Sequence, residues 1–329
     1  MQTEFESQKL SILDAVRLIA ALCIVVLHSF LEKNDFMNIY GAEIIGRWPV
    51  GLFFIISGFF LSFNSKDVFA YCFKILRVYI IWTVFYAVWL NLDIWSPMHF
   101  LSALRSGIIM PFWYFPSLLM CVVFVFFLFT FTKDLRIVCF ITGLMFIIAL
   151  LGCSFRFVPA ISEFMDRFFF PWHERLIGVH HMRNGIFNGS FYIALGALLR
   201  KRYDVDQLKI KNVRFICIAL CFTIILHITE ICFVIHFHTG EPDVLLTSPL
   251  MAALLILFSF QFTMPKDRAI LCRGMSNLVF LSHCFFIDVF QRIGFGQWAV
   301  FTLTVCCSLL FSYTVVIHSK KISPLRYLY

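Results

Sequence analysis

An arginine and a histidine lie eleven residues apart in the first apolar segment of the chain, residues 10–30. At about 100° of rotation per residue in an α-helix, the side chains of Arg17 and His28 point in the same direction, about 16 Å apart along the axis. Imidazole titrates near neutral pH, so His28 could act as a general base, while Arg17 could orient a donor or stabilise developing negative charge. The alternative is structural, with Arg17 reaching the membrane surface and His28 hydrogen-bonded at the interface.

Arg17 is an expensive residue for a helix that only anchors a protein. An arginine at the centre of a membrane-spanning helix costs at least about 2.5–3.5 kcal/mol. Asp14 precedes Arg17 by three residues, which is close enough on a helix for an ion pair that offsets part of this cost. The first helix is therefore expected to serve chemistry or a polar pathway.

A second basic pair, Lys74 and Arg77, lies at the start of the third apolar segment. The two side chains share one face of a helix and are predicted on the cytoplasmic side, as Arg17 is. Such a pair suits the phosphates of an anionic donor such as coenzyme A. The alternative is a pair of charges that only fixes topology by extending to the membrane surface.

Ser57 and Gly58 interrupt the apolar second segment. Small residues let two helices approach closely, so packing is the first interpretation of both. Ser57 is also a candidate substrate-binding residue, because the two small residues could shape a tunnel. A serine nucleophile is less expected, since no G-x-S-x-G turn surrounds Ser57.

Aromatic and polar residues gather in the predicted external connection of about residues 154–185. Trp172 could stack on a sugar, and His173 and Arg175 could hydrogen-bond its hydroxyls. Anchoring at the membrane interface explains the same residues equally well.

His227 and Glu230 share a face of the seventh apolar segment. Three interpretations stay open for them: a hydrogen bond between helices, a substrate or proton role, and a metal site. The last requires at least three converging ligands. We expect no metal elsewhere, because the twelve cysteines lie mostly inside apolar runs without C-x-x-C spacing.

Composition places all these residues in a membrane protein. The 329 residues are 61% hydrophobic and only 14% charged, with a mean hydropathy of +0.88, whereas soluble domains are about one quarter charged. We predict an all-α polytopic bundle forming a single domain, residues 1–329. About ten spans are expected, with nine left open, at residues 10–30, 48–64, 70–91, 112–132, 136–153, 186–200, 213–236, 245–263, 277–293 and 297–318.

The positive charge follows the predicted topology. With both termini in the cytoplasm, nineteen of the 27 lysines and arginines fall on the inner side, as the positive-inside rule requires. The net charge of +8 is thus an orientation signal, and no nucleic-acid partner is expected.

The motifs together resemble the acyltransferase-3 family, integral-membrane acyltransferases that modify cell-surface glycans. Their order and the ten-span length extend the resemblance over nearly the whole chain. One departure is Lys74, where the family usually has an arginine, which puts the donor contacts in question because lysine lacks the bidentate fork. The matching marks are Asp14, Arg17 and His28, the block Phe53–Phe59, Lys74 with Arg77, Phe112–Phe115, Gly274–Asn277 and Leu281–His283.

The resemblance implies an O-acetyltransferase of the cell inner membrane. Cytoplasmic acetyl-CoA, or another acyl-CoA, would bind near Lys74, Arg77 and Arg17. His28 would assist attack by a hydroxyl of a surface polysaccharide or O-antigen precursor. Lipid-linked or nascent glycan, membrane lipid and glycan-assembly enzymes would then be its partners.

A transporter or exporter of a glycan or small anionic solute is the main alternative. Arg17, His28, Glu230 and Asp288 would line its path. Secondary transporters often carry two related halves with broken helices, and the sequence shows no such internal symmetry. A sensor or scaffold without turnover is a further alternative.

Overall fold

The computed structural model describes residues 11–30, 36–92, 96, 107–169, 185–202, 213–237 and 243–329. Within these ranges all regular structure is helical, and no strand occurs, so the predicted all-α fold is confirmed. The predicted sugar-binding residues Trp172, His173 and Arg175 lie outside the described residues.

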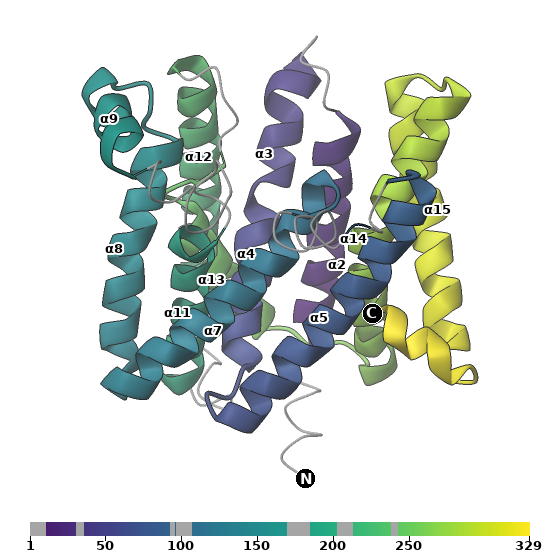
Figure 1. Cartoon of the computed structure of the whole chain (residues 1–329), viewed down its shortest axis with the longest axis horizontal. Coiled ribbons are helices and arrows are strands. Elements are labelled where there is room, and N and C mark those ends of the chain that lie inside the picture. Colours follow the sequence, from purple (N-terminus) through teal and green to yellow (C-terminus); the bar gives the residue numbers. More distant parts are fainter. Residues whose placement is uncertain are drawn as a thin grey trace. The chain divides into compact units, whose positions relative to one another are not determined.

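Twelve of the described elements are α-helices (Figure 1), and four, η1 to η4, are short segments of 3-10 or π type. In chain order the elements are α2 (Ser11–Ser29), η1 (Met37–Gly41), α3 (Ala42–Gly46), α4 (Trp48–Phe60), α5 (Ser65–Trp89), η2 (Met110–Trp113), α7 (Tyr114–Thr132), α8 (Leu135–Cys153), α9 (Pro159–Phe164), η3 (Met165–Phe169), α11 (Ile186–Arg202), α12 (Val213–Phe237), α13 (Ser248–Ser259), α14 (Lys266–Ile293), α15 (Gln297–His318) and η4 (Ser323–Leu328).

Each of the ten predicted spans coincides with a described helix, but not all of them have spanning length. Eight helices are long and apolar enough to cross a membrane, which makes the chain a multi-pass membrane protein. The second is longer than predicted, because η1, α3 and α4 join into the continuous run Met37–Phe60. The other two, α11 with 17 residues and α13 with 12, are shorter than the rest.

Local sequence sets several helix ends. The Asn64 side chain caps α5 by accepting a hydrogen bond from the Asp67 N–H at 2.9 Å, and Asp134 caps α8 in the same way through the Arg136 N–H. Gly294 ends α14 at a φ of 90°, a backbone conformation that favours glycine. These residues fix where α5 and α8 begin and where α14 ends.

The chain forms two compact units, neither of them continuous in sequence. The first combines the described residues of Met1–Phe53, Tyr203–Cys232 and Thr247–Tyr329, and the second those of Phe54–Arg202 and Phe233–Leu246. Two helices, α4 and α12, contribute residues to both units.

In the first unit, α2 and α14 run in the same direction. Asp14 near the start of α2 contacts Arg273 near the start of α14, and His28 near the end of α2 contacts His283 further along α14. Between these two polar contacts, Ala21 and Val25 of α2 pack with Val279 of α14 in a fully buried apolar cluster. The helix pair therefore has a polar group at each end and an apolar centre.

In the second unit, α4 and α11 also run in the same direction and meet at glycines. A Cβ atom on Gly58 would lie 2.0 Å from the Ile193 carbonyl oxygen, and one on Gly196 would lie 2.1 Å from that of Ile55. The two backbones are therefore in direct contact, as small residues in membrane helices permit. The predicted packing role of Gly58 is confirmed.

Candidate active site

The structure confirms that Arg17 and His28 lie on one face of α2, because both side chains contact α14. The Arg17 Nη2 donates to the Asn277 Oδ1 at 3.2 Å, and the His28 ring stacks on the His283 ring with centroids 5.4 Å apart. Contact of both side chains with one helix places them on a single stripe of α2, as the eleven-residue spacing predicts.

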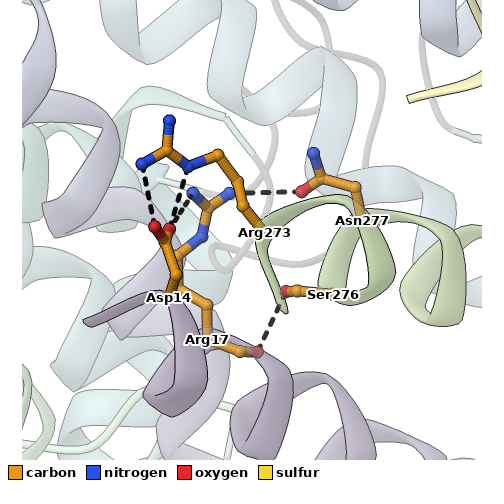
Figure 2. Close-up of polar contacts among 5 residues, drawn as sticks. All are labelled: Asp14, Arg17, Arg273, Ser276 and Asn277. Atoms are coloured by element: carbon orange, nitrogen blue, oxygen red, sulfur yellow. Dashed lines mark hydrogen bonds and ion pairs between the residues drawn. The ribbon is translucent and has the colours of Figure 1, made fainter. Parts of the chain in front are cut away.

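Asp14 is held by two arginines, and the stronger contact is the one the sequence did not indicate (Figure 2). Arg273 binds the carboxylate with two hydrogen bonds, from Nε to Oδ1 at 3.0 Å and from Nη2 to Oδ2 at 2.8 Å. The predicted pair exists as well, but the Arg17 Nη1 lies 3.5 Å from Oδ1, at the outer limit of a hydrogen bond. Arg273 is therefore the principal partner of Asp14.

Asp14, Arg17 and Arg273 do not balance one another in charge. One carboxylate, 4% exposed, faces two guanidiniums, Arg17 at 17% and Arg273 at 46% exposure. The three side chains carry a formal charge of +1, and arginine keeps its proton under all ordinary conditions. Such an arrangement can attract an anionic group.

A polar turn of α14 fixes Arg17 from the opposite side (Figure 2). Besides Asn277, the Ser276 hydroxyl donates to the carbonyl oxygen of Arg17 at 3.0 Å. On the same turn, a Cβ on Gly274 would come within 2.6 Å of Val316 and 3.2 Å of Tyr329, so glycine lets α15 and the C-terminal residue approach. Residues 273–277 of α14 thus bind α2 and α15 together.

His28 and His283 form the other end of the site. His28 is half-buried, whereas His283 is fully buried, and their ring planes are inclined by 30°. The His283 Nδ1 lies 2.8 Å from the Phe280 carbonyl oxygen and 3.2 Å from that of Val279. Because carbonyl oxygens only accept hydrogen bonds, Nδ1 carries the proton of a neutral His283 ring.

The other nitrogen of this ring is then an acceptor. The His283 Nε2 lies 3.3 Å from the Cys284 Sγ, and the thiol is a weak donor that satisfies it. Both nitrogens of His283 are engaged, which fixes the tautomer and the orientation of the ring. His28 therefore rests on an imidazole whose orientation is fixed by α14.

The other predicted site residues that the structure describes belong to the second unit. Ser57 is buried on α4 beside Gly58, and on α5 Lys74 is exposed while Arg77 is half-buried. Their proposed roles in donor and substrate binding stay predictions.

Two of the four residues expected along a transport path have other partners. Glu230 accepts hydrogen bonds from the Thr247 N–H at 2.9 Å and its hydroxyl at 2.6 Å, and the His227 Nδ1 lies 2.7 Å from the same hydroxyl. This joins α12 to the start of α13, which is the hydrogen bond between helices that the sequence left as one interpretation. Asp288 pairs with Arg292 one turn later, at 2.7 Å.

Three contributors to the site were missed as such by the sequence analysis. Arg273 counted only as an inner charge, and Asn277 and His283 only as marks of a resemblance. A signal exists for two of them: Arg273 and Asn277 are four residues apart in α14, so their side chains share one face of the helix. His283 follows Asn277 by six residues, which rotates it by about 120° away from Asn277, so periodicity gives no signal for it.

The comparison with family models identifies the family of the chain. The model of the acyltransferase-3 family, described as an acyltransferase domain, matches residues 10–317, nearly the whole chain and every residue of the α2–α14 site. No curated protein and no solved structure matches the chain. The chain, a multi-pass membrane protein with a polar site between two of its helices, belongs to the acyltransferase-3 family of membrane acyltransferases.

Proposed function

We propose that the protein is an inner-membrane O-acetyltransferase that transfers acetyl from cytoplasmic acetyl-CoA to a hydroxyl of a surface polysaccharide or O-antigen sugar. The family supports acyl transfer. The observation that carries the finer proposal is the α2–α14 pair, which presents a cationic cluster at one end and an imidazole at the other.

The separation of these two groups suits a CoA thioester. Such a donor is elongated, with its phosphates at one end and its reactive carbonyl at the other. Arg17 and His28 are about 16 Å apart along α2, so the phosphates could meet the cationic cluster while the thioester approaches the imidazole. Arg17 is the proposed donor-binding residue of this unit.

Charges of the first unit support a cytoplasmic position for the cluster. The start of α14 and the segment after α15 lie at one end, since Gly274 adjoins Val316 and Tyr329. The opposite end has Arg47 and Arg292, each paired with an acid four residues earlier. By the positive-inside rule, the cluster end faces the cytoplasm. The other cations at the cluster end are Lys266, Arg268, Lys320, Lys321 and Arg326.

His28 is the proposed general base. It takes the proton of the acceptor hydroxyl as the oxygen attacks the thioester carbonyl, the carbon–sulfur bond breaks, and the thiol of CoA leaves with a proton. The neutral His283 ring beneath it favours the imidazolium that forms, since a cation is attracted to the face of an aromatic ring within about 6 Å. The products are an O-acetyl ester and free CoA.

Other residues take supporting roles in the proposal. Lys74 and Arg77 are candidate phosphate ligands, and Ser57 a candidate lining residue for the substrate path. Trp172, His173 and Arg175 are candidates for contacts with the sugar. The acceptor would be a lipid-linked or nascent glycan, supplied by glycan-assembly enzymes.

The test supplies radiolabelled acetyl-CoA to membranes that contain the protein and follows label into lipid-linked glycan. We expect His28→Ala to lower the rate by about 100-fold or more, as loss of a general base does. His318→Ala is the matched control, because this histidine is exposed at the end of α15. Full activity in His28→Ala would refute the mechanism, and export of glycan without label would favour a transporter.

A further inference from the structure

The Asp14–Arg273 ion pair has a role that follows from its geometry. We propose that Arg273 is a positioning residue that holds the Asp14 carboxylate so that Arg17 keeps its positive charge for the anionic part of the donor. The inference rests on the proposed function of Arg17 and extends it to residues of α14.

Asp14 could pair with either arginine, and the structure shows which of the two pairs is closer. Arg273 reaches both carboxylate oxygens, at 3.0 and 2.8 Å, whereas Arg17 reaches one, at 3.5 Å. A two-point contact between guanidinium and carboxylate is the stronger and more directional arrangement. The carboxylate is therefore committed mainly to Arg273 (Figure 2).

Because the Asp14 carboxylate is buried, its pairing with Arg273 instead of Arg17 has consequences for both arginines. The Asp14 side chain is 4% exposed, and a buried carboxylate requires a cationic partner. If Arg273 were removed, Arg17 would be the cation already beside Asp14, within 3.5 Å. We expect the two to close into a tight pair, in which the charge of Arg17 is neutralised and its guanidinium is drawn away from Asn277.

Asn277 completes the arrangement because it holds Arg17 without neutralising it. Its amide oxygen accepts a hydrogen bond from the Arg17 Nη2 at 3.2 Å, and an amide brings no charge. The isosteric change Asn277→Asp would place a carboxylate at the same point. It should therefore mimic the loss of Arg273 from the other side of Arg17.

The experiment measures equilibrium binding of CoA and the KM for acetyl-CoA in the purified full-length protein. Arg273→Gln should weaken CoA binding by at least about tenfold, because Arg17 would then pair with Asp14 and lose its charge-assisted contact with the donor. The value of kcat should change little. Adding Asp14→Asn to Arg273→Gln should restore affinity to within about threefold, because no carboxylate remains to capture Arg17. Asn277→Asp should weaken CoA binding as Arg273→Gln does.

Arg268→Gln is the matched control. Arg268 is an exposed arginine of the same helix, five residues before Arg273, so its loss removes the same charge from the same end. It should leave the affinity nearly unchanged, which separates positioning of Arg17 from a general electrostatic effect.

Two results would overturn the inference. In one, the double variant binds CoA no better than Arg273→Gln, as expected if Arg273 contacts the donor or only supports the fold. In the other, Asn277→Asp leaves CoA affinity unchanged, a result that stands even if Arg273→Gln fails to fold. A wild-type protein that binds CoA but transfers no acetyl would refute the proposed function alone, since the binding series could still be measured.

Discussion

Two helix pairs of this protein are held together by different kinds of contact. The α2–α14 pair of the first unit and the α4–α11 pair of the second both join distant segments that run in the same direction. The first is joined at its ends by an ion pair and by stacked imidazoles. The second is joined by backbone contact at Gly58 and Gly196.

The difference separates packing from chemistry. Membrane helices associate well through small residues that bring backbones together, as α4 and α11 do. A buried ion pair is a poor way to gain stability, because apolar residues of similar volume often serve as well or better. The proposed function accordingly gives the polar groups between α2 and α14 a role toward the substrate, whereas the glycines between α4 and α11 serve packing.

The largest effect is expected at the contact between α4 and α11, where a substitution should disturb packing alone. Gly58→Ala places a Cβ 2.0 Å from the Ile193 carbonyl oxygen, and relief of the overlap should destabilise the protein by about 3 kcal/mol. Gly143→Ala is the control, because its Cβ would meet only the Phe191 ring at 3.4 Å; it should be neutral or slightly stabilising. Thermal unfolding in detergent measures both, and equal stability of the two variants would contradict the prediction.

A smaller effect, confined to catalysis, is expected at the imidazole end of α2–α14. His283→Leu removes the ring beneath His28 and should lower kcat by about 2- to 30-fold, the range of a cation–ring interaction of about 0.5–2 kcal/mol. His283→Phe should recover part of this loss because it retains an aromatic face. Rates are normalised to the amount of protein that binds CoA, so misfolded protein does not count. Equal rates for the Leu and Phe variants would argue against stacking.

Lys74 and Arg77 test whether the second unit serves structure alone. If they bind donor phosphates, Arg77→Ala should raise the KM for acetyl-CoA by about fivefold with a smaller change for the acceptor, and Lys74→Arg should lower it by about twofold, because arginine adds a bidentate fork. An equal change for both substrates in Arg77→Ala would indicate a packing role and would sharpen the division between the units.

The smallest effect is expected at Arg292, whose pairing with Asp288 lies at the surface. The Arg292 side chain is 60% exposed, and pairs of this kind contribute no more than about 1 kcal/mol. Arg292→Gln should therefore change neither thermal stability nor acetyl transfer measurably. A large loss of activity would instead favour the transporter alternative, in which Asp288 lines a polar path.

Geometry within a single helix was predictable, whereas the choice of partner between helices was not. The spacing of Arg17 and His28 placed both on one face, and the structure confirms it. The pairing of Asp14 with Arg17 was also predicted, but its stronger partner is 259 residues away in sequence. Periodicity describes one helix and carries no information about which other helix faces it.

The same limit applies to the rest of the fold. Gly58 could be identified as a packing residue from its type, but Ile193 as its neighbour could not. All ten apolar segments were found as helices, although η1 and α3 lengthen the second and only eight reach spanning length. A membrane topology depends on length as well as hydropathy, and helix ends are set by local caps that a window average blurs.

The parallel course of α2 and α14 constrains how often the chain crosses the bilayer. Two spans that point the same way must be separated by an odd number of crossings. Seven described candidates lie between them: α4, α5, α7, α8, α11, α12 and α13. If the five longer ones all cross the bilayer, the short α11 and α13 either both traverse the lipid or both stop within it, and the described helices then make ten or eight crossings.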